Sequence, residues 1–175
     1  MSKTKNFSIY LAYGSNLDLQ QMSHRCPDAT PIGIAYISGY QLMFKGSKSG
    51  NYATIEKNVL CKVPVLVWAI SKADENRLDI YEGHPTFYYK KTLPIENFKS
   101  LHPEKWTNPP TDGMAYIMHE DRRLGLPSPH YLDILYWGYK DLNLPMHILA
   151  EALDDTAASI WEVKVVTTPR SDRNC

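Results

Sequence analysis

The sequence has few cysteines, no excess of charge and no long hydrophobic run, and each absence excludes a class of protein. Its 175 residues include three cysteines, and 19 basic residues balance 19 acidic ones. This balance argues against a general binding surface for nucleic acid or for an anionic membrane. The longest strongly apolar run, Val63 to Ile70, contains Pro64 and is far too short to cross a bilayer.

The cysteines and histidines show no pattern of a disulfide framework or a metal site. Cys26, Cys61 and Cys175 have no Cys-x-x-Cys spacing, so we expect free thiols in a reducing compartment. The polar stretch 1–6 is not followed by the apolar segment of a signal peptide, and we therefore expect a cytoplasmic protein. His24 lies near Cys26, but no second ligand pair follows at zinc spacing, so we predict no metal.

The alternation of short apolar runs with capped helical segments predicts one α+β domain, with a mixed sheet or barrel and helices packed outside it. The proline-containing stretch 96–112 is expected to be a loop. Helices are expected from Ser15 to Pro27, from Ser71 to Tyr81, from Ser128 to Tyr136 and from Pro145 to Leu153. Strands are expected at 7–13, at 32–44 as two short strands, and at 52–56, 63–70, 87–95, 114–118 and 160–166.

The segment Tyr13-Gly14-Ser15-Asn16-Leu17 is the first candidate for a functional site. A strand that ends in Gly-Ser-Asn and opens a helix leaves backbone N–H groups without helical partners. Such groups can bind a carboxylate, a phosphate or a developing oxyanion. The same residues are also compatible with an ordinary capped helix after a glycine turn. The segment lacks the spacing of a Walker loop or of a dinucleotide-binding fingerprint.

Glu82 is the second candidate, because it ends a predicted helix just before Gly83. The negative end of the helix dipole disfavours a carboxylate there, and apolar surroundings would raise the pKa of Glu82 further. A carboxyl group with a raised pKa suits proton transfer near neutral pH. The alternative is a solvated glutamate that happens to precede a helix-ending glycine. The aromatic residues expected around it are Tyr81, Phe87, Tyr88 and Tyr89.

The ordered set of motifs resembles the γ-glutamylcyclotransferase (AIG2-like) family. Tyr-Gly-Ser-Asn-Leu stands at 13–17, Leu-Asp-Ile-Tyr-Glu-Gly at 78–83 and Pro-Ser-Pro-His-Tyr at 127–131, with a tyrosine soon after the glutamate. The likeness runs from about Ile9 to Pro145 and is to the general branch rather than the glutathione-specific one. It implies a domain over 1–153 and a C-terminal extension of uncertain role over 154–175.

This resemblance implies a small mixed-strand β-barrel ringed by helices, with a substrate cavity at one end. The implied reaction converts a γ-glutamyl amine or amino acid, a small-molecule substrate, into 5-oxoproline and the free amine without metal or cofactor. The implied general acid/base is Glu82. The implied substrate-binding residues are Tyr13, Gly14, Ser15, Asn16, Leu17 and Tyr131, together with Tyr89 or its neighbour Tyr88.

Two other functions compete with this enzyme. One is a small-molecule binding module that keeps the cavity but has lost turnover; retention of Glu82 within its motif argues against it. The other is a protein-interaction role for the C-terminal third, where Trp137 and Trp161 could dock a partner instead of packing in the core. The sequence leaves open whether the protein is a monomer or a homodimer.

Overall fold

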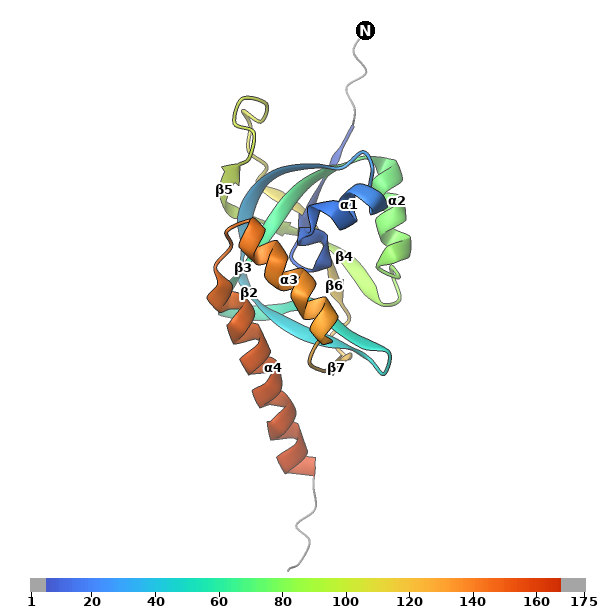
Figure 1. Ribbon diagram of the computed structural model, residues 1–175, viewed down its shortest axis with the longest axis vertical. Helices are drawn as coiled ribbons and strands as arrows, with labels where there is room; N and C mark the ends of the chain where they lie inside the picture. The colour runs from blue at the N-terminus through green and yellow to red at the C-terminus, as the bar shows by residue number, and fades with distance from the viewer. Residues whose placement is uncertain (1–5, 168–175) are drawn as a thin grey trace, which may run out of the picture.

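A single curled sheet forms the body of the protein (Figure 1). The computed structural model describes residues 6–167, with side chains described through residue 161. The strand order is β4-β6-β1-β3-β2-β5, with β7 paired to β2; β1 and β6 are parallel and the other pairs antiparallel. The strands are β1 Ser8–Ala12, β2 Thr30–Ser47, β3 Gly50–Ile70, β4 Tyr88–Pro94, β5 Glu96–Ser100, β6 Asp112–Met118 and β7 Arg123–Leu124.

The long hairpin of β2 and β3 curls the sheet into a half-barrel. Its register shifts where Gly39, with φ of 78°, lies opposite the extra residues 58–61 of β3, and such bulges bend a strand without ending it. The curl brings the first half of β3 against β6, where the Met118 amide donates to Thr54 Oγ1 at 3.0 Å. The predicted α+β fold with a mixed, barrel-like sheet is confirmed.

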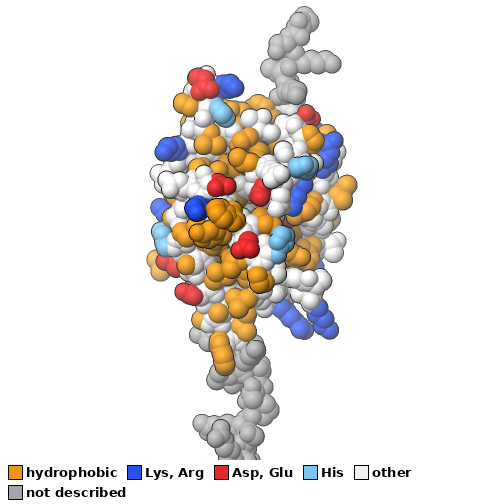
Figure 2. Space-filling model, viewed as in Figure 1, with side chains coloured by type: hydrophobic (Ala, Val, Ile, Leu, Met, Phe, Trp, Pro, Cys, Tyr) orange, Lys and Arg blue, Asp and Glu red, His pale blue; other side chains and the backbone are white. Residues whose placement is uncertain are grey.

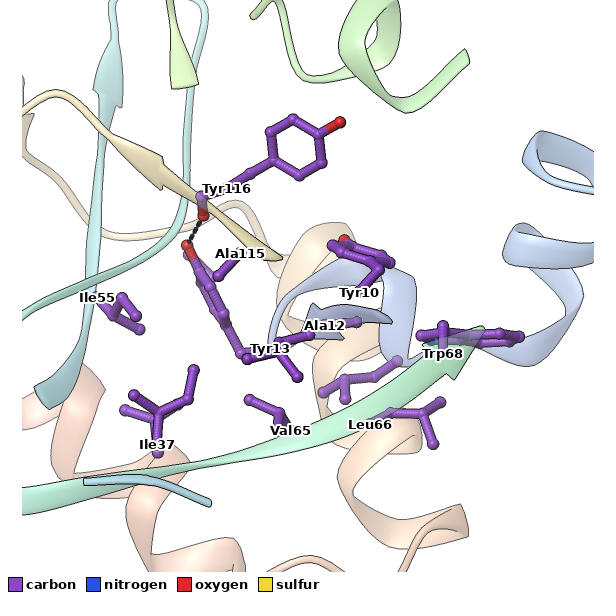
Figure 3. Packing of buried hydrophobic residues seen from close by; sticks show 14 of the residues in the cluster. Tyr10, Ala12, Tyr13, Ile37, Ile55, Val65, Leu66, Trp68, Ala115 and Tyr116 are labelled. Carbon is purple, nitrogen blue, oxygen red and sulfur yellow. Dashed lines mark hydrogen bonds between the residues drawn. The ribbon is translucent and has the colours of Figure 1, made fainter. Parts of the chain in front are cut away.

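The core lies inside this curl (Figure 3). Every residue from Val63 to Ile70 is buried. The run includes Pro64 but no polar residue, so it lacks polar alternation, as expected for a strand covered on both faces. Figure 3 shows Tyr13 pointing toward β6, where its hydroxyl donates to the Tyr116 carbonyl. The Tyr10 ring packs edge-on against the Tyr116 ring, with centroids 5.8 Å apart.

Within residues 6–167, four α-helices and one 3-10 turn pack around the sheet. They are η1 Ser15–Leu17, α1 Leu19–Arg25, α2 Lys72–Tyr81, α3 Pro129–Asp141 and α4 Met146–Thr167. The predicted capping box of Ser71 and Asp74 is confirmed at α2. The predicted start of the first helix at Ser15 is wrong, because residues 15–17 form the 3-10 turn and the Asp18 side chain caps α1 instead, accepting from the Gln21 amide at 2.9 Å.

Further expectations differ from the structure. The strands expected separately at 52–56 and 63–70 are parts of the single strand β3. Residues 32–44 belong to one continuous strand, because the bulge at Gly39 absorbs the break expected there. The stretch 96–112 is not all loop, since β5 pairs with β2 as an edge strand. The prediction of a final strand at 160–166 is wrong, because α4 continues through these residues. No proline or glycine interrupts the helix that begins at Met146, and β-branched residues disfavour a helix only weakly.

Helix α3 packs on η1, and helix α4 packs on the sheet, each at a defined point. A Cβ on Gly138 of α3 would stand 2.8 Å from Leu17 Cβ, so glycine allows α3 to lie directly on η1. The buried Thr156 hydroxyl of α4 accepts from the Phe44 amide at 3.3 Å, and α4 then extends beyond the sheet (Figure 1). No helix in the described part of the chain is both long and apolar enough to cross a membrane.

The exposed surface is mixed in character. Figure 2 shows hydrophobic side chains gathered over the face that carries α3, with acidic and basic side chains scattered around them. Tyr136 and Trp137 of α3 are both about half exposed, and Lys140 stacks on the Trp137 ring at 4.7 Å. These two aromatic residues therefore lie on the surface rather than in the core, as does Trp161 of α4.

Candidate active site

A cavity of about 350 Å³ opens where the end of β1, the end of α2 and the start of β3 meet. Tyrosine is the most frequent residue in its wall, and Glu82 is the one charged side chain among its described lining residues. Glu82 is partly buried there, among aromatic rings and hydroxyl groups. The tyrosines of the wall are Tyr10, Tyr13, Tyr52, Tyr81, Tyr88, Tyr116 and Tyr131.

The predicted loop 13–17 forms one side of the cavity, although its five residues have different surroundings. Gly14 and Ser15 line the cavity, and a Cβ on Gly14 would stand 3.1 Å from the Tyr131 hydroxyl oxygen. A side chain at this position would therefore require the Tyr131 hydroxyl to shift by a few tenths of an ångström. Leu17 does not line the cavity; it is fully buried in the core beneath α3.

Asn16 is a buried polar residue, and both the nitrogen and the oxygen of its side-chain amide make hydrogen bonds. Its Nδ2 donates to the Tyr10 hydroxyl at 2.9 Å and to Glu82 Oε1 at 3.3 Å. Its Oδ1 accepts from Arg25 Nη1 at 2.6 Å. Its backbone carbonyl also accepts from Trp68 Nε1 at 3.2 Å, which ties the loop to β3. Buried polar groups are usually satisfied in this way, and here the partners fix one orientation of the amide.

Glu82 is the C-cap of α2, followed by Gly83 in the left-handed conformation with φ of 61°. The glycine ends the helix and turns the chain so that the carboxyl group faces the cavity. Burial raises the pKa of Glu82 from 4.5 to about 7, while the nearby charge of Arg25 and the Asn16 hydrogen bond act in the opposite direction. Burial also raises the pKa values of Tyr10, Tyr13 and Tyr88 well above their ordinary value. Glu82 is therefore the group of this cavity that titrates near neutral pH.

The two tyrosines that sequence spacing left open point in opposite directions, because side chains alternate along β4. Tyr88 lines the cavity and donates to the Ala53 carbonyl at 2.9 Å. Tyr89 faces away and donates to Glu120 Oε1 at 2.6 Å. Of the two residues, Tyr88 is therefore the one that meets the cavity.

Ala53 at the start of β3 holds two of the phenols. Its amide donates to the Tyr131 hydroxyl at 3.2 Å, and its carbonyl accepts from Tyr88. The backbone of Ala53 therefore fixes the positions of both the Tyr88 and the Tyr131 hydroxyl groups. Tyr131 reaches it from the first turn of α3, where the Ser128 hydroxyl caps the helix by accepting from the Tyr131 amide.

Comparison with known proteins shows the family of the chain. The profile of the gamma-glutamyl cyclotransferase, AIG2-like family matches residues 10–134. The chain belongs to this family. It is 29% identical over 145 residues to the γ-glutamylcyclotransferase of Homo sapiens, covering 79% of this chain and 73% of that protein. It is 30% identical to the Bos taurus γ-glutamylcyclotransferase over the same length and the same shares.

A solved structure of a γ-glutamyl cyclotransferase also matches the fold. It superposes with a TM-score of 0.70 at 25% identity, over 84% of this chain and 86% of that chain. The membership predicted from the three motifs is thus confirmed. The family match ends at residue 134, within α3, so the remainder of α3 and all of α4 lie outside it.

Several residues in and behind the cavity of this γ-glutamyl cyclotransferase family member were not predicted from the sequence. Tyr10, Tyr52 and Tyr116 line it, and Arg25 binds Asn16 from behind. None of them stands in a motif, since each belongs to an ordinary strand or helix segment. Tyr10 precedes the loop by three residues, and an inward-facing aromatic on the strand that leads into the loop is the one signal that could have indicated it.

Within 6–161, no three side chains of histidine, cysteine, aspartate or glutamate come together as a metal site would require. Cys26, which is buried beside α2, has a pKa raised to about 11 by burial and is poorly suited to act as a thiolate.

Proposed function

We propose that this protein is a γ-glutamylcyclotransferase that cyclises a γ-glutamyl amine or amino acid to 5-oxoproline and releases the free amine. Membership of the family supports this reaction class. The observation that carries the proposal is the Glu82 carboxyl group, with a pKa raised to about 7, in a tyrosine-lined cavity beside the loop 13–17. A carboxyl group with this pKa can accept a proton and return it at neutral pH.

In the first step the Glu82 carboxylate removes a proton from the substrate α-ammonium group. The free α-amine then attacks the γ-carbonyl carbon of the same molecule. Because the attack is intramolecular and forms a five-membered ring, orientation in a confined cavity lowers much of the barrier. No protein nucleophile is required, so Ser15 serves as a loop residue rather than as an attacking alcohol.

Attack produces a tetrahedral intermediate with a negative oxygen, which needs hydrogen-bond donors. The amides of Leu17 and Asp18 bond to the carbonyls of Gly14 and Ser15 within the 3-10 turn. The Ser15 amide already faces the Tyr131 hydroxyl, so the Asn16 amide is the loop donor that we assign to the oxyanion. Fixed donors of this kind act strongly because they need no reorganisation when the charge develops.

Collapse of the intermediate breaks the bond between the γ-carbon and the leaving nitrogen. Protonated Glu82 gives its proton to that nitrogen, then takes the second proton from the new ring nitrogen and passes it to the departing amine. Both protons that leave the α-nitrogen therefore end on the amine, and Glu82 carries them one at a time. One carboxyl group serves every transfer, as expected where Glu82 is the one charged group among the described lining residues.

The test is release of 5-oxoproline from a panel of γ-glutamyl amino acids and γ-glutamyl amines. Wild type should release 5-oxoproline from at least one of them, and Glu82→Gln should not do so at a comparable rate. Binding of these compounds, shown by a thermal shift, without turnover by wild type would instead support the non-catalytic binding module. If wild type showed no binding and no turnover of any of these compounds, both functions would be contradicted.

A further inference from the structure

The Arg25 side chain lies behind the cavity, where it contacts both segments that form the site. We infer that Arg25 is a positioning residue: its guanidinium fixes the side-chain amide of Asn16 so that Asn16 presents a hydrogen-bond donor to Glu82. This inference rests on the function proposed above. Arg25 is absent from the cavity lining, so it acts through Asn16 and does not touch the substrate.

The orientation of Asn16 follows from the chemistry of its partners. Arg25 Nη1 lies 2.6 Å from one end of the amide, and a guanidinium has donors only. That end must be the oxygen, so the nitrogen faces Tyr10 and Glu82. Were the amide reversed, two donors would face each other at Arg25 and an acceptor would face the Glu82 carboxylate, and both contacts would become unfavourable.

The guanidinium is itself held at several points, which makes it a rigid support. Nη1 also lies 3.3 Å from Ser15 Oγ, and Nη2 donates to Gln21 Oε1 at 2.6 Å, one helical turn back on α1. Its central carbon stands 3.9 Å from the ring centroid of Tyr81, the residue before Glu82. Arg25 therefore contacts the loop on one side and the end of α2 on the other. A planar fork can make these contacts together, and a lysine ammonium cannot.

Arg25 also affects the charge state of the site. Among the described groups that act on Glu82, Arg25 is the cation, and its charge lowers the pKa of Glu82 against the effect of burial. The other titratable groups that face Glu82 are phenols and one thiol, whose raised pKa values keep them neutral at physiological pH. They are Tyr10 of β1, Tyr13 after β1, Cys26 after α1, Tyr88 of β4, Tyr116 of β6 and Tyr131 of α3. Tyr52 and Tyr81 also line the cavity.

The experiment compares Arg25→Gln and Arg25→Lys with Arg123→Gln, a matched control at an exposed position of β7. The first measurement is the titration of the Glu82 carboxyl carbon by ¹³C NMR in the ligand-free proteins, assigned with Glu82→Gln. The second is the pH dependence of kcat and KM for 5-oxoproline release. Thermal unfolding establishes that each variant is folded.

In Arg25→Gln we expect the Glu82 titration and the acidic limb of kcat/KM to move to higher pH. We also expect kcat to fall about 10- to 100-fold with little change in KM, since misplacing a catalytic group costs rate more than binding. Arg25→Lys should keep the titration near that of wild type but lose several-fold in kcat, because one ammonium cannot replace the fork. If Arg25 had only a structural role, Arg25→Gln would lower the stability of the protein and leave the pKa of Glu82 unchanged.

A folded Arg25→Gln protein that matches Arg123→Gln in titration and in kcat would overturn the inference. Should Arg25→Gln not fold, Arg25→Lys decides, and kcat equal to wild type would then refute the role. If wild type releases no 5-oxoproline, the proposed function fails separately. The NMR titration still reports whether Arg25 controls Glu82, because it needs no turnover.

Discussion

The amide nitrogen of Asn16 lies 3.3 Å from a carboxyl oxygen of Glu82, although 66 positions separate the two residues. The pairing of Ser8 with Ile70 places the start of β1 beside the end of β3, just before α2. The five residues of β1 and the ten of α2 each span roughly 15 Å, since a strand rises about 3.4 Å per residue and a helix 1.5 Å. Strand and helix therefore end at the same level, which brings the loop and the glutamate together.

Replacing Glu82 with glutamine should remove the proton shuttle while keeping the shape of the side chain. We expect kcat for 5-oxoproline release to fall on the order of 10²- to 10⁴-fold, the usual contribution of one general acid/base group. Substrate affinity should change much less, because the loop amides remain. Single-turnover product release and ligand-induced thermal shift measure the two effects.

The matched control for this variant is Glu120→Gln, since Glu120 is exposed and bonds Tyr89 outside the cavity. It should retain the turnover of wild type. Equal turnover in Glu82→Gln would show that Glu82 is a bystander. Loss of turnover together with loss of folding would assign it a structural role.

The stability of the protein should depend on the ionisation of Glu82. Its pKa is about 7 in the native state against 4.5 for an unperturbed glutamate, so the native state binds more protons between these values. This group's contribution to stability therefore falls as pH rises from 4.5 to 7, and the full penalty persists above 7.

Glu82→Gln removes this penalty, so the variant should gain stability relative to wild type as pH rises through that window. The gain should reach about 3–4 kcal/mol at most, because a pKa difference from 4.5 to about 7 contributes about 1.4 kcal/mol for each pH unit. Urea unfolding of both proteins at a series of pH values from 4 to 8 measures it. A difference in unfolding free energy that stays constant over this range would contradict the raised pKa.

The opposite orientations of Tyr88 and Tyr89 predict opposite outcomes for two matched substitutions. Tyr88→Phe removes the hydrogen bond to the Ala53 carbonyl inside the cavity wall, so we expect kcat/KM to fall about tenfold and stability to fall by about 1 kcal/mol. Tyr89→Phe removes a bond to an exposed glutamate and should leave kcat/KM within about twofold. Steady-state kinetics and thermal unfolding of both variants test this, and the reverse ranking would place Tyr89 at the site.

Gly138→Ala should destabilise the protein, although alanine is the better helix former. In a free helix the change would stabilise by about 1 kcal/mol. Here the new Cβ would stand 2.8 Å from Leu17 Cβ, so α3 must move off η1 at a cost of about 1–3 kcal/mol. Chemical unfolding measures the sign, with the exposed Ala150→Gly on α4 as a measure of helix propensity alone. A stabilised Gly138→Ala protein would show that α3 and η1 pack loosely.

Local sequence chemistry determined much of this protein. The capping box of Ser71 and Asp74, the proline after Ser128 and the glycine after Glu82 fix helix ends through bonds to near neighbours in the chain, so they could be predicted. The unbroken apolar run 63–70 likewise predicted a strand covered on both faces. The three motifs, in their order, also identified the family.

Tertiary structure decided what depends on distant contacts. Nothing near β4 in the sequence reveals whether Tyr88 or Tyr89 faces the cavity, because the choice is made by Ala53 and Glu120 on other elements. The helix through 160–166 was missed because local β propensity is weaker than continuation of a helix already anchored by Thr156 on β2. Arg25 and the phenols of Tyr10, Tyr52 and Tyr116 carry no motif, and only the curl of the sheet gathers them around Glu82.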